Sequence, residues 1–594
     1  MAVTLRCHPL PAPRAMIPIR GLRAMRAAAS LPSSGTLAAR ASLPTLATLA
    51  AIGTLAAIGT LPAPAAAQAL PDSTARRVDA LFSRFDATSP GCLVGVGRNG
   101  SVVHARGYGM ANLEYGVPLT RESISESGSV AKQFTAAAVA LLQLEGRLSL
   151  DDDVRKYLPE VPDFGATITI RNILTMTSGL RDQWALLMLM GRGPGSEVHT
   201  NNLILDLVRR QRELNFAPGS EYLYSNTGYV LAATIVSRVS GMPFAQFTQE
   251  RLFKPLGMTH TQWRDDYRRV VPGRATAYAF ERGAWVQDMP FTMVHGNGGL
   301  LSTVDDLLKW NEALTNGFPG NPGLTRLLET QARLTDGRTI PYALGLQVRE
   351  WAPGVREVSH SGSTAGYRTF LARYPEAKVS LAVWCNAANA NAVQLGRQVA
   401  ALLVARPAAA RPAPTPVAPA ERANLVGSYR DPRTDSWLGI AAVGDYLRVI
   451  GPSADSLRAD GGAGRYTTSS GVRLAFTPAS GKATALRLET ADGDVMEATT
   501  LAPPASAALA LDDFTGTYRS PELESRIVIG ADNGRLVLRI SPDEVFTLSP
   551  FYTDGFRMGA SPASIRFVRD AAGKVVGARI FNGRARNVRF DREG

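Results

Sequence analysis

A stretch rich in proline and alanine, "ARPAAARPAPTPVAPAERAN", interrupts the chain after its second third, starting at Ala405. This composition favours a stiff, extended linker, so no single hydrophobic core continues through it. The 594 residues are enough for several domains. We therefore predict one domain at 70–405, a linker at 406–422 and separate structure beyond it.

The chain beyond the linker repeats one all-β pattern twice. "NLVGSYRDP", which starts at Asn424, is echoed by "DFTGTYRSP" at Asp513, and short strands with alternating apolar residues follow each copy. Two copies of about 80 residues are too few for a solenoid, so we predict two small antiparallel, lipocalin-like β-barrels at 423–503 and 511–594. Neither copy carries clustered histidines, cysteines or carboxylates that would indicate its own chemistry.

The domain at 70–405 has strand patterns at both ends and helical patterns between them. "GCLVGVGRNGSVVHARGYG" predicts a β-hairpin that turns at "RNG". "REVSHSG", "YRTFLARYPE" and "VSLAVWCNA" predict strands before a last helix over 391–404. Apolar residues at helical spacing fill the middle, as in "NTGYVLAATIVSRVSG". The order predicts an α+β domain with one antiparallel sheet flanked by helices.

Residues 1–69 predict an export signal. Arginines up to Arg40 precede the apolar run "LPTLATLAAIGTLAAIGTLPAPAAAQAL", whose small residues suit cleavage after Ala67 or Ala69. The alternative is a single membrane anchor, because 43–61 is nearly long enough to span a bilayer. The prolines and the A-x-A pattern favour cleavage, so we expect a soluble, periplasmic or secreted mature protein.

Charge and composition argue against several partners. The formal net charge of +13 falls to +7 without the leader, and the remaining arginines form no run or stripe of the kind that binds nucleic acid. Six single histidines without ligand spacing predict no metal, and nothing indicates a cofactor. The sequence leaves the oligomeric state open.

A serine and a lysine stand one turn apart where an apolar helix is predicted to begin, in "SESGSVAKQFTAAAV". Ser129 and Lys132 would share a helix face, because residues three apart are neighbours. A serine hydroxyl needs a base to become a nucleophile, and a desolvated lysine can be that base. None of the other six lysines follows a serine at this spacing. The pair alone also fits a lysine that simply reaches solvent.

Two further motifs follow in order, "YSN" at 224–226 and "HSG" at 360–362. With the S-x-x-K pair, they resemble the motif set of serine β-lactamases and penicillin-binding proteins. "FAPGSEYLYSNTGYVLA", "PLGM" and "GNGGLLSTVDDLLKW" are similar to the class C-like branch, and the resemblance covers most of 70–405. It implies a β-lactamase/transpeptidase-like fold. The C-terminal barrels resemble the arrangement in D-aminopeptidases of that branch.

The resemblance implies a role for each residue of the first two motifs. Ser129 would attack a carbonyl carbon and become acylated. Lys132 and Tyr224, the latter expected as a phenol of low pKa, would move the proton. Asn226 would donate a hydrogen bond to the substrate amide or accept one from the Lys132 ammonium.

The third motif would form the opposite wall of the site. The strand with His360 and Gly362 would line it, and Ser363 would offer a second oxyanion N–H beside that of Ser129. Gly362 would allow close approach of the substrate backbone.

His360 stands where many relatives carry lysine. Its ordinary pKa near 6.5 leaves it mostly neutral at pH 7, so a substrate carboxylate loses an anchor unless an arginine from elsewhere provides one. We therefore predict weak β-lactamase activity and a preference for substrates without a free carboxylate beside the scissile bond. Substrates that carry one should bind more tightly as pH falls through the His360 pKa.

Three features depart from the family pattern or leave alternatives open. Met176 occupies the usual position of a histidine, which puts one supporting hydrogen bond in doubt. "RDQWALLMLMGRGPG" fits a core helix better than an apolar lip at the site entrance. His295 lies near the segment that borders the site in the family, or is structural.

The family's sheet places its first strand beside its last, so Cys92 and Cys385 would be neighbours. A disulfide and two buried free thiols are the alternatives, with the thiols favoured.

Together these features predict an exported serine hydrolase that cleaves an amide or ester bond of a small-molecule or peptide substrate through an acyl-Ser129 intermediate. Peptidase, esterase and β-lactamase activities remain open because the fold hosts all three, and His360 in place of a lysine favours a peptidase or esterase. The alternative is a non-hydrolysing penicillin- or peptide-binding protein with the barrels as interaction modules. Turnover of an acyl group would separate the two.

Overall fold

The computed structural model describes residues 69–405, 413–450, 454–501, 510–559 and 563–594. The predicted export signal lies outside the described residues except for its last residue. Within the described ranges, no helix has both the length and the apolar character needed to cross a membrane.

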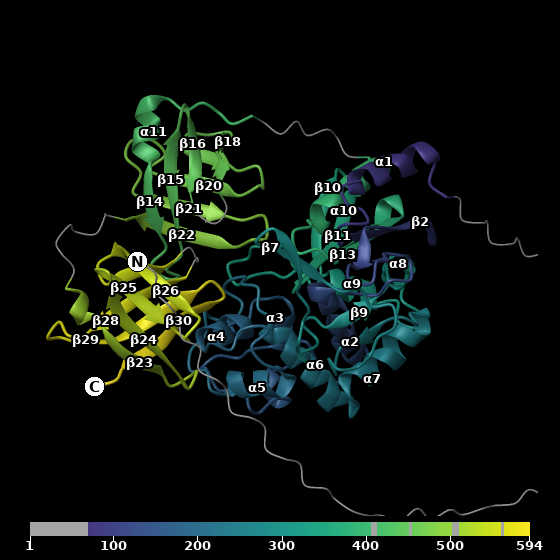
Figure 1. The fold of residues 1–594 in the computed structure, drawn as a ribbon, viewed down its shortest axis with the longest axis horizontal. Helices are drawn as coiled ribbons and strands as arrows, with labels where there is room; N and C mark the ends of the chain where they lie inside the picture. Colours follow the sequence, from purple (N-terminus) through teal and green to yellow (C-terminus); the bar gives the residue numbers. More distant parts are fainter. Residues whose placement is uncertain (1–68, 406–412, 451–453, 502–509, 560–562) are drawn as a thin grey trace, which may run out of the picture. The chain divides into compact units, whose positions relative to one another are not determined.

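A six-stranded antiparallel sheet forms the centre of the hydrolase region, with the order β10-β11-β12-β13-β1-β2 (Figure 1). It joins the first strands of this region to its last: β1 (Cys92–Arg98), β2 (Ser101–Tyr108), β10 (Gln347–Ala352), β11 (Val355–Thr364), β12 (Tyr367–Tyr374) and β13 (Val379–Cys385). Asn99 and Gly100 make the β1–β2 turn with φ of 50° and 81°, as the Asn-Gly pair predicts. The predicted antiparallel sheet is confirmed.

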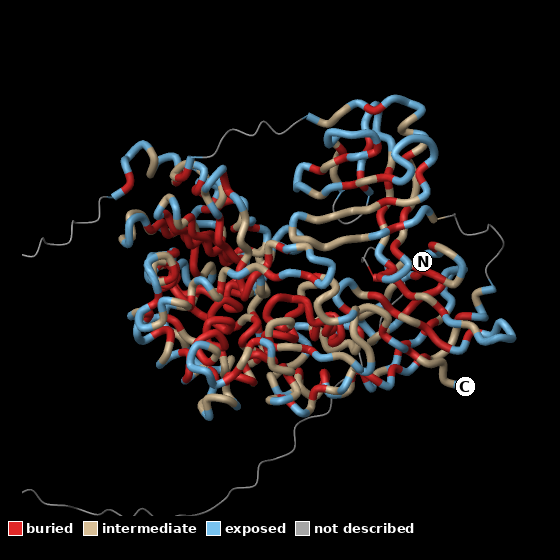
Figure 2. Tube along the Cα trace, turned by 180° about the vertical axis from the view of Figure 1, so that it is seen from behind, coloured by how far each residue is buried: buried red, intermediate tan, exposed pale blue. Residues whose placement is uncertain are grey.

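Helices pack on both faces of this sheet because its central strands are apolar on both sides. Cys92, Val94 and Val96 of β1 belong to one buried cluster with α1 (Asp72–Phe82) and α10 (Ala392–Leu403). Leu93, which points to the opposite face, belongs to the cluster of α2 (Lys132–Leu144), α6 (Thr227–Ser240) and α8 (Val304–Asn316). Figure 2 shows buried stretches concentrated inside this region.

Helix α2 is buried on all sides along most of its length, which explains its run of alanines. Helix α6 ends where Gly241 adopts the left-handed conformation, with φ of 75°. The remaining short elements of the region are α3 (Ile170–Leu174), α4 (Gln183–Leu189), α5 (Asn201–Arg209), α7 (Phe244–Thr248), α9 (Leu324–Glu329), β3 (Met110–Asn112), β4 (Val117–Pro118), β5 (Ser125–Glu126), β6 (Gln262–Trp263), β7 (Tyr278–Glu281), β8 (Ala284–Gln287) and β9 (Leu300–Ser302).

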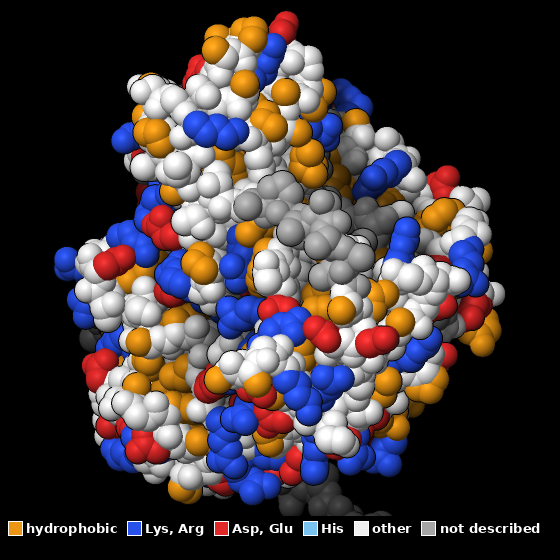
Figure 3. Space-filling view, turned by 90° about the vertical axis from the view of Figure 1, so that its left-hand side faces the viewer, with side chains coloured by type: hydrophobic (Ala, Val, Ile, Leu, Met, Phe, Trp, Pro, Cys, Tyr) orange, Lys and Arg blue, Asp and Glu red, His pale blue; other side chains and the backbone are white. Residues whose placement is uncertain are grey.

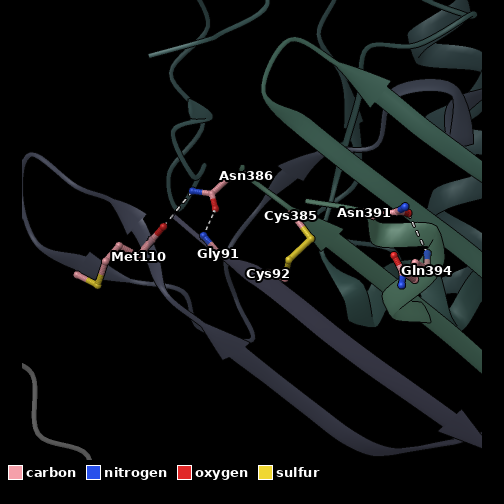
Figure 4. Close-up of a disulfide and its surroundings, with 7 residues drawn as sticks. All are labelled: Gly91, Cys92, Met110, Cys385, Asn386, Asn391 and Gln394. Carbon is pink, nitrogen blue, oxygen red and sulfur yellow. Dashed lines mark hydrogen bonds between the residues drawn. A yellow bond between two sulfur atoms is a disulfide. The ribbon is translucent and has the colours of Figure 1, made fainter. Parts of the chain in front are cut away.

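A disulfide joins the first and last strands of the region in sequence order. Cys92 lies directly opposite Cys385 in the antiparallel register of β1 and β13, and the two sulfurs are bonded (Figure 4). Beside the bridge, Asn386 accepts a hydrogen bond from the backbone N–H of Gly91 at 2.8 Å and donates one to the Met110 carbonyl at 2.9 Å. The adjacency of the cysteines is confirmed, and the free thiols that we favoured are wrong, because directly opposed positions bring the two sulfurs together.

The first C-terminal unit is a nine-stranded antiparallel sheet that is nearly closed. Its edge strands, β17 (Asp455–Ser456) and β18 (Arg458–Ala459), are separated only by Leu457, so the two edges adjoin. Between them lie β14 (Gly427–Arg430), β15 (Trp437–Val443), β16 (Tyr446–Ile450), β19 (Arg465–Thr467), β20 (Arg473–Thr477), β21 (Ala485–Glu489) and β22 (Val495–Thr500). Helix α11 (Pro419–Leu425) precedes the sheet, so the predicted extended linker is wrong over its last residues. Proline at the start of a helix is compatible with helical geometry.

The second unit is a closed eight-stranded barrel, β23 (Gly516–Ser520), β24 (Ser525–Asp532), β25 (Arg535–Arg539), β26 (Val545–Tyr552), β27 (Gly555–Met558), β28 (Ser564–Arg569), β29 (Val575–Asn582) and β30 (Ala585–Arg592). The sequence echo has a structural counterpart. The buried Tyr429 donates to the Leu425 carbonyl at 2.8 Å, and the buried Tyr518 donates to the Phe514 carbonyl at 2.7 Å. The same bond thus recurs at the start of each predicted barrel.

Charged side chains on the face in Figure 3 are mixed in sign. Lysine and arginine lie interspersed with aspartate and glutamate there, and no continuous basic stripe crosses this face.

Candidate active site

Ser129 lies on a single 3-10 turn, η1 (Gly128–Ala131), which leads directly into α2. The α-helix itself begins at Lys132, so the predicted α-helical first turn is tighter than expected. Gly128 has a φ of 51°, and a Cβ there would lie 2.6 Å from the backbone nitrogen of Ser363. Only glycine therefore allows the Ser129 turn to pack this closely on β11.

Lys132 makes three polar contacts, which both the ammonium and the neutral amine can satisfy. Its Nζ lies 3.1 Å from Ser129 Oγ, 2.9 Å from Asn226 Oδ1 and 2.6 Å from the Asn297 carbonyl oxygen. The last two atoms only accept hydrogen bonds, and a neutral amine has two N–H donors and one lone pair. In the neutral form, the lone pair faces the Ser129 hydroxyl, which is the arrangement that a general base requires.

The surroundings of Lys132 favour this neutral form. The side chain is fully buried, with 0% exposure, and burial lowers the pKa of Lys132 well below its usual 10.5. The negative charge of Asp182 opposes the shift, whereas the positive charge of Arg584 adds to it. Desolvation dominates, as the sequence-based hypothesis of a desolvated lysine requires.

Tyr224 lies beside this pair as a protonated phenol. Lys132 Nζ is 4.9 Å from the centroid of its ring. Desolvation raises the pKa of Tyr224 above its usual 10, although a hydrogen bond with Ser129 and the charge of Arg584 lower it. The expectation of a low-pKa phenol is therefore wrong, because desolvation of the phenolate outweighs the nearby cation. A protonated phenol can donate a proton to a leaving group.

Asn226 is held in place by Asp182, a residue that the sequence motifs did not single out. The backbone N–H and the side-chain Nδ2 of Asn226 donate to Asp182 Oδ2 at 2.7 and 2.8 Å, which leaves the amide oxygen for Lys132. Asp182 is only 2% exposed and also caps α4 by accepting from the backbone N–H groups of Trp184 and Ala185. An aspartate before an apolar helix predicts the cap but not the contact with Asn226.

His360 lies on β11 and is a neutral, buried side chain. Its Nδ1 lies 2.6 Å from the Ser361 carbonyl, which can only accept, so Nδ1 carries the proton and Nε2 accepts from Tyr342 Oη at 3.1 Å. Burial lowers the pKa of His360 to about 3, and a proton on Lys132 would add to this effect. The predicted tightening of carboxylate binding through His360 near neutral pH is therefore wrong, because the ring stays neutral there. Tyr342 was another partner that the motifs did not indicate.

Gly362 and Ser363 lie where β11 meets the Ser129 turn. A Cβ at Gly362 would lie 2.0 Å from the Ser127 carbonyl oxygen and 3.1 Å from the Ser129 nitrogen. The glycine thus allows the chain's own backbone to approach, rather than that of a substrate. This contact places the backbone of Ser129 beside that of Ser363.

The segments that departed from the family pattern have structural roles. Met176 has a φ of 62°, and its sulfur accepts a hydrogen bond from the Ser225 backbone N–H at 3.3 Å. His295 bonds to the Met293 carbonyl at 2.9 Å and stacks on Phe244. Most of α4 is buried, as expected of a core helix, and Trp184, Pro194 and Gly195 of the same segment also line the cavity beside Ser129.

A cavity of about 1020 Å³ opens onto Ser129, Tyr224 and His360. Its lining includes residues from both C-terminal units: Asp492 and Asp494 at the β21–β22 turn, and Arg584 at the β29–β30 turn. Among the residues described, no group of three or more histidine, cysteine or carboxylate side chains is arranged to hold a metal ion.

Comparisons with known proteins agree with this geometry. A family model described as Beta-lactamase matches residues 78–406, and a domain of unknown function (DUF3471) matches residues 501–593. The chain is 27% identical to a D-aminopeptidase of Brucella canis over 534 residues, which covers 85% of this chain and 96% of that protein. It is 30% identical to penicillin-binding protein 4* of Bacillus subtilis over 298 residues, 48% of this chain and 65% of that protein, slightly under two thirds of its length.

The fold is also found among solved structures. The octameric penicillin-binding protein homologue from Pyrococcus abyssi matches with a TM-score of 0.52 and 24% identity, over 72% of this chain and 99% of that one. The family model spans more than half of the chain and includes Ser129, Lys132, Tyr224 and His360. The chain is a serine hydrolase, and it belongs to the Beta-lactamase family.

Proposed function

We propose that the protein is an exported hydrolase that cleaves amide or ester bonds of small D-amino-acid derivatives through an acyl-Ser129 intermediate. The observation that carries this proposal is the burial of Lys132, which is 0% exposed and whose Nζ lies 3.1 Å from Ser129 Oγ. The similarity to a D-aminopeptidase extends through the C-terminal units, which favours a peptidase or esterase over a β-lactamase.

In the proposed first step, Lys132 Nζ takes the proton of Ser129 Oγ while the oxygen attacks the substrate carbonyl carbon. The oxyanion accepts hydrogen bonds from the backbone N–H groups of Ser129 and Ser363. Tyr224 donates its phenolic proton to the leaving nitrogen or oxygen, and the Lys132 ammonium reprotonates the phenolate. Water then attacks the acyl group, with the same residues removing its proton and restoring Ser129.

The neutral His360 supports the preference for peptide or ester substrates over β-lactams. A lysine at that position would present a permanent cation to the acid group of a β-lactam, and histidine with its pKa lowered to about 3 presents none at neutral pH. His360 alone therefore predicts weak β-lactamase activity.

The test is a time course of intact-protein mass with three acyl donors: D-alanine p-nitroanilide, an activated ester and a penicillin. A short-lived acyl adduct on Ser129 with release of product supports the proposal, and Ser129→Ala is the control. An adduct that accumulates without product would favour a non-hydrolysing binder. Absence of any adduct and product would refute the acyl-enzyme.

Export is tested separately by the N-terminal mass of the protein recovered from expressing cells. A start near residue 68 or 70 in the periplasmic fraction supports the cleaved signal. A full-length chain in the membrane fraction would support the anchor instead.

A further inference from the structure

The catalytic cavity receives a cation from the second barrel. Arg584 lies in the turn between β29 and β30, and its guanidinium carbon is 4.6 Å from the centroid of the Tyr224 ring. The same residue lines the cavity that opens onto Ser129. Because His360 is neutral, β11 presents no positive charge to the cavity. The second barrel presents one, the guanidinium of Arg584.

The backbone of Arg584 is anchored while its charged group is not. Its carbonyl oxygen accepts hydrogen bonds from the Asp182 backbone N–H at 3.1 Å and from Asn215 Nδ2 at 3.0 Å. Among the described residues, no side chain or carbonyl accepts a hydrogen bond from its guanidinium and no carboxylate pairs with it; its contact is the face of Tyr224. Its N–H donors are therefore available to a ligand in the cavity.

The other arginines that line the cavity have protein partners. Arg264 forms a bidentate ion pair with Glu126, at 2.8 Å for both bonds. Arg368 donates to the carbonyl oxygens of Ala365 and Tyr367. Arg584 differs from both because its donors are unused, and unused donors of a guanidinium fit a carboxylate in a planar, bidentate way.

The turn that carries Arg584 is held against the site by buried contacts. The Arg181 guanidinium is fully buried and pairs with Glu522 of the barrel, and it also donates to the Arg586 and Asn587 carbonyls at 3.1 and 3.3 Å. Arg181 directly precedes Asp182, which positions Asn226. These contacts bind the second barrel to the segment at Arg181 and Asp182, next to the catalytic residues, and hold the Arg584 turn in place.

Two carboxylates share the cavity with Arg584 and leave its charge available. Asp492 already pairs with Arg349 and accepts from Gln347. Burial raises the pKa of Asp494 to about 6, an effect that Asp492 increases and Arg584 opposes. Within the described ranges, neither carboxylate forms an ion pair with Arg584.

We propose that Arg584, contributed by the region that matches a domain of unknown function, binds a carboxylate on the leaving-group side of the scissile bond. The side follows from Tyr224, which protonates the leaving group in the proposed mechanism, so a cation stacked on Tyr224 lies beside that group. The preferred substrates are then short peptides whose departing residue carries a free carboxylate. This inference rests on the proposed function for its choice of side, and it reverses the substrate preference expected from His360 alone.

The test compares one peptide in two forms, D-alanyl-D-alanine and D-alanyl-D-alaninamide, with the full chain. Arg584→Gln should lower the acid-to-amide ratio of kcat/KM by roughly 10- to 100-fold, the range expected when a hydrogen-bonded charge is lost, and mainly through KM for the acid. Arg584→Lys should retain part of the ratio. Arg519→Gln, an exposed position on β23 outside the cavity, is the matched control and should leave the ratio unchanged. Equal losses for acid and amide would overturn the proposal.

Binding to the Ser129→Ala protein separates this inference from the proposed function. Calorimetric titration should show the acid binding more tightly than the amide, with the difference lost in Ser129→Ala/Arg584→Gln. If the wild-type protein hydrolyses neither peptide but this difference is present, the proposed function fails and the carboxylate site stands. If the acid binds no more tightly than the amide, the carboxylate site is refuted.

Discussion

The two C-terminal units start from the same sequence pattern yet present opposite charges to the catalytic cavity. The first unit contributes Asp492 and Asp494 from its β21–β22 turn, and the second contributes Arg584 from its β29–β30 turn. Both retain the same buried tyrosine bond at their first strand, so the repeated scaffold is kept while the turns differ. Chemistry is carried by the turns that a rigid scaffold presents, which makes the turns the place to test each unit's contribution.

The two units can be compared in this way only if both contribute to one catalytic site, the one at Ser129. Loss of Ser129 or Lys132 tests this and should have the largest effect on activity. Ser129→Ala should abolish turnover, and Lys132→Ala should lower kcat by about 10² to 10⁴-fold, because general base catalysis has that magnitude. Hydrolysis of p-nitroanilides and esters measures both. Activity that survived in Ser129→Ala at the parent rate would mean that one of the barrels, or another residue, carries its own chemistry.

The contacts by which the two units meet the hydrolase region should differ in strength. Glu522 and Arg181 have side-chain exposures of 2% and 0%, whereas Asp492 and Arg349 have 45% and 21%. Glu522→Ala leaves the buried Arg181 with only the partly exposed Glu213 as a charged partner, at 3.4 Å, and should lower the free energy of unfolding by up to about 3 kcal/mol. Asp492→Ala should cost only about 0 to 1 kcal/mol. Urea unfolding curves check the pair, and equal losses would contradict the distinction between the two contacts.

Asp182 is the point where the second unit reaches the catalytic residues. Both carboxylate oxygens of Asp182 accept hydrogen bonds from N–H groups. Asp182→Asn replaces one of these oxygens with an NH2 group, which cannot accept a hydrogen bond from its N–H partner. We expect kcat to fall about 10- to 100-fold with a smaller change in KM, since hydrogen bonds to charged groups contribute about 1.5 to 3 kcal/mol.

A matched control for this prediction is Thr200→Ala, which removes the N-cap of α5. It should lower stability by about 1 kcal/mol without a comparable change in kcat. A wild-type kcat in Asp182→Asn would show that Asn226 needs no such support.

Much of the fold follows from local sequence signals, because each of those signals acts over a few residues. The Asn99-Gly100 turn, the helix stop at Gly241 and the duplicated tyrosine motif are of this kind. The motif spacing also places Ser129 and Lys132 together, since it reflects helical geometry within one turn.

The remaining features depend on contacts between distant segments. Asp182, Tyr342 and Arg584 reach the site from three separate parts of the chain, and no motif marks them. The direction of the Tyr224 pKa shift depends on desolvation, which in turn depends on packing that the motif does not encode. The disulfide likewise follows from the register of β1 and β13 rather than from either cysteine's neighbours in the sequence.

The buried His360 of the hydrolase region predicts a loss of stability in acid. Its folded pKa of about 3 lies below its unfolded value of 6.5, so below pH 6.5 the unfolded chain takes up a proton that the folded chain does not. The stability that this group contributes is present above pH 6.5 and falls by up to about 1.4 kcal/mol per pH unit as pH drops toward 3. Urea unfolding of wild type and His360→Gln between pH 4.5 and 7 checks this. Parallel curves for the two proteins would refute the assignment.

Asp494 in the first unit should have the opposite and smaller effect. Burial raises its folded pKa to about 6, above the unfolded 3.8, so between these values the folded chain holds a proton that the unfolded chain has lost. Its contribution to stability therefore rises as pH falls through 6, whereas that of His360 declines.

Asp494→Asn should make the protein slightly more stable at pH 7 and remove this part of the pH dependence, because the amide avoids burying a charge. The same urea series, with the exposed Asp460→Asn of the first unit as control, measures the difference. If Asp494→Asn were less stable than wild type at pH 7, the Asp494 carboxylate would be making a favourable ionic contact. Its negative charge beside Arg584 would then stabilise the folded protein rather than destabilise it.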